Sequence, residues 1–163
     1  MADDEAAVTM RAPRPGDEAH WRVMWADFLT GDDEPCPPES TDRLWRDVLA
    51  DDGPLRMLIA ADAADAPIGF MIYATHAYAR TPRPVCYLIE LYVDPRRRGA
   101  GIGSAFLERL RQIGREAGWL KIHWMTQADN FAAHRLYDKF GKRSPLVRYD
   151  MHVNDYVAGD GGD

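Results

Sequence analysis

The first third of the chain carries apolar side chains at helical spacing in two segments. Residues 17–29 place large apolar groups three or four positions apart, which predicts a helix that Asp17 can cap. Residues 41–49 repeat the pattern and predict a second helix. The apolar positions of the two segments are Trp21, Met24, Trp25, Phe28, Leu44, Trp45, Val48 and Leu49. A short strand is predicted before them at 8–11, and the prolines of 30–40 predict a loop between them.

The middle of the chain has the pattern of three strands. Residues 55–61 and 68–78 are apolar runs on either side of a turn-like stretch, so they predict an antiparallel hairpin. Residues 85–93 are apolar nearly throughout, as expected of a strand that is buried on both faces. The prolines at 81–84 predict a break before this strand.

The second half alternates helices and strands. A helix is predicted at 103–117, with Gly118 as the residue that ends it. Strand 119–126, helix 130–140 and strand 146–153 are predicted to follow it. This order predicts right-handed crossovers within one mixed sheet, so the fold class is α/β.

Length and composition predict a single domain. The chain has 163 residues, of which 46% are hydrophobic and 28% are charged, which is typical of one soluble globular domain. We expect this domain to span residues 8–153. The segments 1–7 and 154–163 have little to bury, so we expect a disordered N-terminus and a flexible C-terminal tail.

Charge and cysteine content narrow the partners and the compartment. The net charge of -6 gives no field that would draw the protein to nucleic acid, but it would weakly attract a cationic small molecule. Cys36 and Cys86 lack the spacing of a metal site, and two reduced thiols are typical of a cytoplasmic protein. The acidic N-terminus does not resemble a signal peptide, and no stretch is long and apolar enough to span a bilayer. We therefore expect a cytoplasmic protein with no metal and no membrane or nucleic-acid partner.

A glycine-rich turn joins strand 85–93 to the helix that follows it. Glycine permits positive φ and lets a ligand approach the backbone closely, and the first N–H groups of a helix have no partners within it. Three alternate glycines stand here beside three arginines, which can bond phosphate oxygens. The turn therefore suits a pyrophosphate, although a tight connection without a ligand can have the same composition. A dinucleotide motif or a Walker loop fits poorly, because the turn lies past the middle of the chain and lacks Gly-Lys-Ser/Thr.

Three motifs follow one another along the second half of the chain. Residues 98–103 read Arg-Gly-Ala-Gly-Ile-Gly and match the pattern Arg/Gln-x-x-Gly-x-Gly/Ala. Before them, residues 91–95 read Leu-Tyr-Val-Asp-Pro and match Leu-x-Val-x-Pro. After them, residues 130–141 match Asn-x-x-Ala-x-x-x-Tyr followed by a short run to glycine. In these motifs the chain resembles the GNAT superfamily of N-acetyltransferases.

The likeness extends to a subgroup that includes polyamine and small-basic-protein acetyltransferases. Its opening pattern, Arg-x-x-x-x-x-Asp-x-x-x-Trp, is similar to the placing of Arg11, Asp17 and Trp21. Its pattern Trp-x-Thr-Gln-x-x-Asn is similar to residues 124–130, and its ending Arg-Tyr-acidic-Met is similar to residues 148–151.

The resemblance implies a GNAT fold, in which a mixed, mostly antiparallel sheet of about six or seven strands is flanked by about four helices. The fourth and fifth strands would diverge, and acetyl-CoA would lie in the wedge between them. The backbone of residues 91–93 would pair with the pantetheine arm, and the glycine turn would hold the pyrophosphate. Asn130 would contact the cofactor arm, and Tyr137 would lie near the thioester sulfur. The cofactor-binding residues implied in this way are Leu91, Tyr92, Val93, Arg98, Gly99, Ala100, Gly101, Ile102, Gly103, Ser104, Asn130 and Tyr137.

The implied reaction is direct attack of an amine on the thioester carbonyl. The amine must lose a proton, and the departing thiolate benefits from a proton donor. Tyr137 is the candidate general acid, although its apolar neighbours on the last helix also fit a core tyrosine. Glu90 is the candidate general base, because a carboxylate in an apolar strand is costly to bury unless it has a partner or a function.

The sequence around Glu90 departs from the family pattern. Relatives in this subgroup often read Glu-Asp-Leu where this chain reads Ile89-Glu90-Leu91, so the first carboxylate is missing. In a regular strand Glu90 would face the other side, but a bulge could turn it inward. An arginine partner at the sheet surface is the plain alternative, and Tyr87 acting through a water is a second candidate base.

Two functions stay open at this point. The first is acetyl-CoA-dependent N-acetylation of a primary amine, which could be a small cationic amine, an amino acid or a lysine side chain. The second is a non-catalytic acyl-CoA-binding regulator, which the altered carboxylate pair keeps open. We further expect a homodimer joined through strand 146–153, because this strand ends the chain at a sheet edge. His123 and His134 are given no role, because single histidines are more often surface or core residues.

Overall fold

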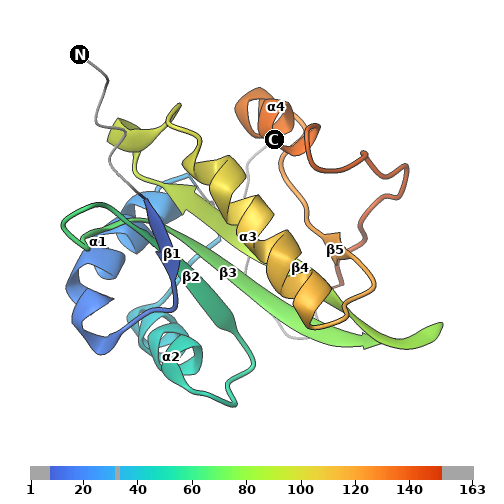
Figure 1. Ribbon diagram of the computed structural model, residues 1–163, viewed down its shortest axis with the longest axis horizontal. Helices are drawn as coiled ribbons and strands as arrows, with labels where there is room; N and C mark the ends of the chain where they lie inside the picture. Colours follow the sequence, from blue (N-terminus) through green and yellow to red (C-terminus); the bar gives the residue numbers. More distant parts are fainter. Residues whose placement is uncertain (1–7, 32–33, 152–163) are drawn as a thin grey trace.

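Residues 8–31 and 34–151 are described by a computed structural model of the protein; the expected tails at 1–7 and 154–163 lie outside them. The described residues form one curled, five-stranded sheet in the order β1-β2-β3-β4-β5 (Figure 1). Neighbouring strands run antiparallel from β1 to β4, whereas β4 and β5 run parallel. The strands are β1 Thr9–Arg11, β2 Arg56–Ala61, β3 Pro67–Tyr78, β4 Thr81–Val93 and β5 Ile122–His123.

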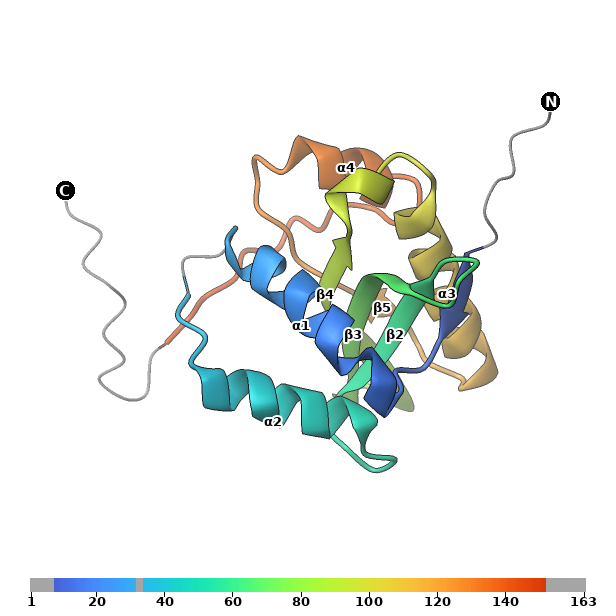
Figure 2. The ribbon, with the colours of Figure 1, turned by 90° about the vertical axis from the view of Figure 1, so that its left-hand side faces the viewer.

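Helices lie on both faces of the sheet. Two helices, α1 and α2, pack on one face, which we call the α1 side (Figure 2). The other two, α3 and α4, pack on the opposite face, which we call the α3 side. None of the helices among the described residues is long and apolar enough to cross a membrane. The helical elements are η1 Pro15–Asp17, α1 Glu18–Leu29, α2 Pro38–Leu49, η2 Pro95–Arg97, α3 Ile102–Glu116 and α4 Phe131–Tyr137, where η denotes a single 3-10 turn.

Three stacked tryptophans form the centre of the α1-side core. Trp21 has no exposed surface, and its ring lies 4.8 Å from that of Trp45 and 5.7 Å from that of Trp25, measured between centroids. Phe70 of β3 meets Trp21 and Trp25 from the sheet. The helical spacing of apolar positions therefore predicted the buried stripe of α1 and the partner that α2 supplies.

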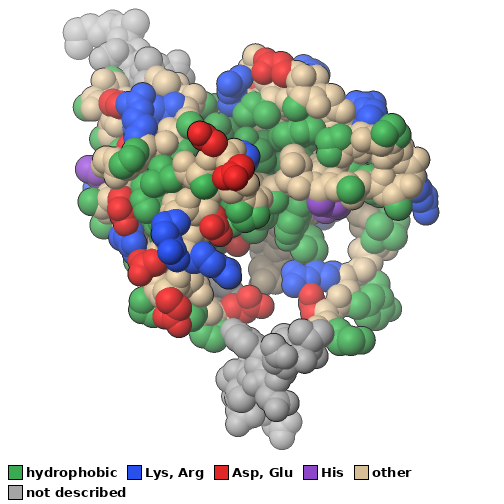
Figure 3. All heavy atoms as spheres, turned by 90° about the horizontal axis from the view of Figure 1, so that it is seen from below, with side chains coloured by type: hydrophobic (Ala, Val, Ile, Leu, Met, Phe, Trp, Pro, Cys, Tyr) green, Lys and Arg blue, Asp and Glu red, His purple; other side chains and the backbone are tan. Residues whose placement is uncertain are grey.

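The sheet has five strands among the described residues, so the expectation of six or seven is wrong. The predicted strand at 119–126 pairs with β4 only over Ile122–His123, because the chain leaves β4 after that point. The predicted strand at 146–153 is absent from residues 146–151, and its last two residues lie outside the described part. From Val147 onward its apolar side chains alternate as in a strand but face solvent. The exposed apolar residues are Leu146, Val147, Tyr149 and Met151. Figure 3 views the molecule from below and shows apolar side chains on the far side of an opening at the right. Figure 1 draws this segment on the same side of the molecule.

The predicted break at 81–84 is also wrong, because β4 begins at Thr81. Thr81 pairs with Tyr78 of β3 across a two-residue turn, so β3 and β4 form one long hairpin. The prolines there are tolerated because the register with β3 is irregular between His76 and Tyr78. Proline still offers a carbonyl acceptor, and Leu120 N–H donates to the Pro84 oxygen over 2.8 Å.

Candidate active site

The turn between β4 and α3 presents unpaired backbone donors to open space. Gly99 and Gly101 have φ of 83° and 78°, a left-handed conformation that strains any residue with a Cβ. A Cβ built on either glycine would meet no heavy atom of the described protein within 4 Å, so both Cα positions are open. Gly101 caps α3, and the first amides of α3 have no partner within the helix. An anion such as a phosphate fits this arrangement.

Gly103 has a different role from the other two glycines. A Cβ at this position would come within 2.8 Å of the Leu136 side chain on α4. The missing side chain therefore lets α4 pack directly against the first turn of α3. Asn130 fixes the other end of this contact, since its Oδ1 caps α4 by accepting from Ala133 N–H over 3.1 Å.

The three arginines of the turn have different partners. Arg96 pairs with Asp94 over 2.7 Å, and Arg97 pairs with Asp62 over 3.3 Å. Arg98 is exposed and donates its Nε–H to the Val93 carbonyl over 3.1 Å. Among the described residues Arg98 takes part in no ion pair, which leaves it as the cation of the three best able to meet a phosphate.

Strands β4 and β5 are joined at one end and then diverge. Their register pairs Cys86 with Ile122 and Tyr87 with His123, where β5 ends. β4 continues to Val93, so its backbone edge beyond Tyr87 faces away from β3 without a neighbouring strand among the described residues. This is the wedge that the resemblance implied, with the glycine turn at its open end.

A bulge in β4 decides which way Glu90 faces. In the register with β3, Glu90 lies opposite Ile72 and Leu88 lies opposite Tyr73, so Ile89 is an extra residue. Leu88 packs in the α3-side core, and Ile89 packs in the α1-side core. Alternation beyond the bulge places Glu90 on the α1 side. Without the bulge, Glu90 would share the α3 side with Leu88. The bulge therefore reverses the side that Glu90 faces, as the sequence analysis required for a base in the wedge.

Glu90 of β4 lies within electrostatic range of Tyr137 of α4. Tyr137 lies on α4 and meets Trp124 edge to face, with ring centroids 5.4 Å apart. Burial, and to a lesser extent the charge of Glu90, raise the pKa of the Tyr137 phenol above its ordinary value. The phenol therefore keeps its proton at neutral pH. These are the two side chains that the sequence analysis proposed as general base and general acid, and those roles stay predictions.

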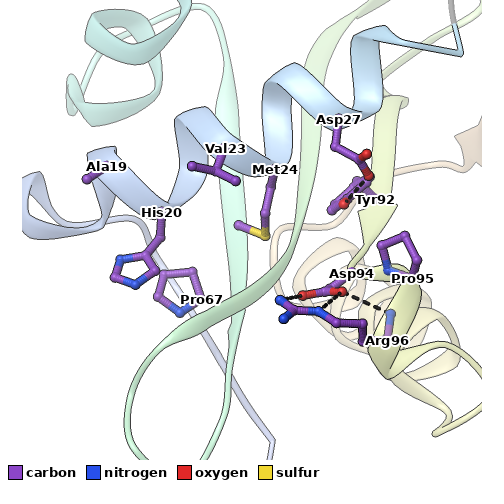
Figure 4. Close-up of a pocket in the computed structure, with 10 residues that line it drawn as sticks. All are labelled: Ala19, His20, Val23, Met24, Asp27, Pro67, Tyr92, Asp94, Pro95 and Arg96. Carbon is purple, nitrogen blue, oxygen red and sulfur yellow. Dashed lines mark hydrogen bonds and ion pairs between the residues drawn. The ribbon is translucent and has the colours of Figure 1, made fainter.

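The side chain of Tyr92 points away from the wedge. Its hydroxyl donates to Asp27 Oδ2 of α1 over 2.6 Å, and burial followed by this bond raises the pKa of Tyr92 to about 12. The pair lies in a trough of about 640 Å³ between α1 and the end of β4 (Figure 4). Of Tyr92, therefore, only the backbone is available to a ligand in the wedge. The trough is lined by Ala19, His20, Val23, Met24, Asp27, Pro67, Tyr92, Asp94, Pro95 and Arg96.

Cys86 is not a nucleophile in this site. It is fully buried under α3, and burial raises the pKa of its thiol to about 12, so the reactive thiolate does not form at neutral pH. Among residues 8–31 and 34–151, no three His, Cys, Asp or Glu side chains come together to hold a metal ion. Cys86 is therefore unsuited to form a covalent acyl intermediate here.

One group was missed from the sequence. His123 meets His76 of β3 beside the ring of Tyr87. His76 and His123 stand 47 residues apart, and no spacing rule links them. Only the register of β3, β4 and β5 shows that they meet, so an accurate strand alignment was the signal required.

Known proteins match this chain in sequence and in fold. The profile of the Acetyltransferase (GNAT) family matches residues 20–142. D-amino-acid N-acetyltransferase HPA3 of Saccharomyces cerevisiae is 28% identical over 144 residues, which cover 87% of this chain and 89% of the yeast protein. Aminoglycoside N(6')-acetyltransferase type 1 of Stenotrophomonas maltophilia is 25% identical over 139 residues, which cover 83% and 86% of the two chains.

A solved structure supports the same fold. The ribosomal-protein-alanine N-acetyltransferase of Brucella melitensis biovar Abortus 2308 superposes with a TM-score of 0.74 at 20% identity, over 90% of this chain and 99% of that one. The family profile spans more than half of the present chain, and members of this family use acetyl-CoA as co-substrate. The chain belongs to the Acetyltransferase (GNAT) family.

Proposed function

We propose that this protein transfers the acetyl group of acetyl-CoA directly to a primary amine, with Glu90 as general base and Tyr137 as general acid. The observation that carries the proposal is that these two side chains, from β4 and α4, lie within electrostatic range of each other beside the diverging strands. A base and an acid beside one cleft suit a reaction in which a proton leaves the nucleophile and another reaches the leaving group.

The cofactor would lie along the wedge with its phosphates at the glycine turn. The backbone amides from Gly99 to Ser104, those of Ala100 and Ile102 included, would hold the diphosphate together with the Arg98 guanidinium. The backbone of Leu91 to Val93 would pair with the pantetheine arm. Asn130 would contact the same arm from the start of α4. The open space in front of Gly99 and Gly101 supports this placement.

The chemistry follows from where the protons must go. Glu90 would take a proton from the ammonium, because only the neutral amine can attack the carbonyl. Tyr137 would give its proton to the thiolate that leaves as the carbon–sulfur bond breaks. No covalent enzyme intermediate is needed, so holding the amine in line with the carbonyl supplies much of the rate.

A small amine is the acceptor class that the observations favour. The relatives are named for a D-amino acid and for an aminoglycoside, both of which carry amino groups on small molecules. The net charge of -6 and the carboxylate of Glu90 suit a cationic acceptor. The narrower likeness to polyamine and small-basic-protein acetyltransferases stays a prediction, as does transfer to a lysine side chain.

Thiol release tests the proposal. The protein should release CoA from acetyl-CoA when amines of these classes are added. Tyr137→Phe should lower kcat about 100-fold, because the sulfur loses its proton donor, while calorimetry should show nearly unchanged affinity for CoA. Tyr149→Phe is the matched control, because Tyr149 is 90% exposed and should leave both values unchanged.

The alternative function is an acyl-CoA-binding regulator without turnover. It is favoured by Ile89, which stands where subgroup relatives often carry the first of two carboxylates. A protein that binds acetyl-CoA in the calorimeter but releases no CoA with any amine of the panel would replace the enzyme by this regulator.

Assembly and location complete the proposal. We expect residues 8–153 to form one cytoplasmic domain that pairs as a homodimer through the last segment. The exposed apolar side chains of residues 146–151 support such pairing, because an apolar strip of this kind usually has a partner. Light scattering of the purified protein should give twice the mass of 18.4 kDa; a monomer at working concentration would contradict the dimer.

A further inference from the structure

Two histidines from strands that are not neighbours meet on the α1 side of the sheet. His76 lies on β3 and His123 on β5, and their Nε2 atoms are 3.4 Å apart. Between them, the Tyr87 ring of β4 stacks on His123 with ring centroids 5.2 Å apart. Tyr87 and His123 form the last residue pair before β4 and β5 diverge. The histidine pair therefore starts at the closed end of the wedge and leads to His76, which is exposed.

The two imidazole rings point at each other nitrogen to nitrogen. Their centroids are 5.7 Å apart, which exceeds the distance between the Nε2 atoms by 2.3 Å (5.7 less 3.4). This difference is close to twice the distance from an imidazole centre to its own nitrogen. Both Nε2 atoms therefore lie near the line that joins the ring centres, as in an N–H···N hydrogen bond. The contact is long for such a bond, and the exposed His76 ring has room to shorten it.

The backbone beside His76 sets the direction of this bond. The Nδ1 atom of His76 lies 2.9 Å from the Ala77 carbonyl oxygen. A carbonyl only accepts, so Nδ1–H donates, and in the neutral ring Nε2 of His76 keeps the lone pair. His123 then donates its Nε2–H to His76, and Nδ1 of His123 is left with a lone pair that can take a proton.

The proposed reaction releases one proton to solvent in every turnover. The acceptor nitrogen carries three protons as an alkylammonium and one as an amide, so it loses two. One of them balances the proton that Tyr137 gives to the thiolate. The other has to leave the wedge.

We propose that His123 and His76 form the exit for this second proton, a role that rests on the acetyl transfer proposed above. In this proposal water carries the proton from Glu90 to Nδ1 of His123, and His123 passes its Nε2 proton to Nε2 of His76. His76 then gives up its Nδ1 proton to water. Both rings are then neutral but in the other tautomer, with protons on Nδ1 of His123 and Nε2 of His76, so each ring must flip or exchange its proton with water before the next turnover. His76 is exposed, so water has access to its ring.

The groups around His123 keep it ready to accept a proton. Partial burial, followed by His76 and Lys121, lowers the pKa of His123 below its ordinary value. From β4, Tyr87 stacks on the ring, and Arg148 of the last segment lies within electrostatic range of Tyr87. His123 is therefore neutral at neutral pH, and the exit closes as pH falls through its lowered pKa.

His76→Gln removes the outer half of the exit without removing a residue that faces the wedge. In dilute buffer this change should lower kcat about tenfold, and imidazole added to the buffer should restore it. The acid limb of the pH profile should move to higher pH, because His76 lowers the pKa of His123 and its removal raises that pKa. His20→Gln is the matched control, since His20 lies in the trough beside α1 and should change none of these values.

Nitrogen NMR of the histidine rings tests the link without any turnover. Wild-type protein should show His123 protonated at Nε2 and His76 at Nδ1, and His76→Gln should shift the titration of His123 upward. The opposite tautomers, or an unshifted titration, would overturn the link itself. If CoA is released but kcat and the pH profile of His76→Gln match wild type, the exit alone is wrong. If wild-type protein releases no CoA, the acetyl transfer fails and the exit fails with it.

Discussion

Three of the four α-helices are well packed on the sheet, and α4 is not. On the α1 side, α1 buries Trp21, Met24 and Trp25 against the sheet and α2. On the α3 side, α3 is equally well buried, but no residue of α4 is. The proposed acid Tyr137 lies on this weakly buried helix, and the segment after it exposes its apolar side chains.

This difference shows that the fold places its tightly packed cores and its proposed active site in different regions. Strands β4 and β5 can enclose a ligand only if they stop pairing, and α4 then has little sheet to pack against. The α1 side compensates with a dense aromatic core that holds β3 and β4 in place. Stability should therefore depend mainly on the cores beneath α1 and α3, and turnover on the region around α4.

Trp21→Ala should have the largest effect on stability. Trp21 is fully buried and stacks on two other tryptophans, so its loss should lower the free energy of unfolding by about 3–5 kcal/mol. Phe131→Ala on α4 is the matched change, because Phe131 is 67% exposed, and it should cost less than about 0.5 kcal/mol. Urea denaturation measures both. Similar losses of unfolding free energy in the two variants would mean that α4 is packed as tightly as α1.

A second prediction compares two carboxylates that both pair with arginine. Asp17, beside α1, accepts from both terminal nitrogens of Arg11 over 2.7 and 2.9 Å, and its side chain is 7% exposed. Asp138, after α4, pairs with Arg143 over 2.8 Å in solvent. Asp17→Asn should lower the free energy of unfolding at neutral pH by about 1.5–3 kcal/mol. Asp138→Asn should change it little, because exposed pairs are screened by water.

The Asp17 pair also predicts how stability changes with pH. Hydrogen bonds from Arg11 hold the pKa of Asp17 below its ordinary value of 3.8 in the folded protein. Its contribution is therefore complete above that value and is lost as pH falls through the lower, folded pKa. Wild-type protein should lose stability on acidification more steeply than Asp17→Asn. Parallel curves in urea denaturation from neutral to acidic pH would contradict the role given to this pair.

The same division explains what the sequence could predict. The apolar spacing of α1 and α2 and the hairpin of β2 and β3 were predictable, because each pattern reports burial against a large partner. The glycine turn was predictable because backbone chemistry, rather than distant contacts, dictates its residues. The sequence suggested that a bulge could turn Glu90 inward. It could not show that a bulge is present at Ile89, because this depends on the register of β4 with β3.

The errors gather around the wedge. The apolar run at 119–126 predicted a full strand, although only Ile122–His123 pairs, because Trp124 packs beside the α4 residue Tyr137 instead. The alternation at 147–151 is that of a strand, but alternation does not supply a neighbour. Local sequence predicts which face of a segment can be buried. It does not predict whether another strand or helix lies there to cover that face.

Gly101→Ala has the smallest of these expected effects on stability, and it tests whether the glycine turn faces the ligand. Gly101→Ala should cost about 1–2 kcal/mol, because φ of 78° is strained for alanine, although the new methyl group meets no protein atom within 4 Å. The methyl would instead occupy the space proposed for the CoA diphosphate, so affinity for CoA should fall at least tenfold. Gly16→Ala controls for the substitution, since Gly16 has equal space and an ordinary φ. Urea denaturation and calorimetry separate the two effects. If G101A loses stability as expected but binds CoA as tightly as wild type, the phosphates do not lie at this turn.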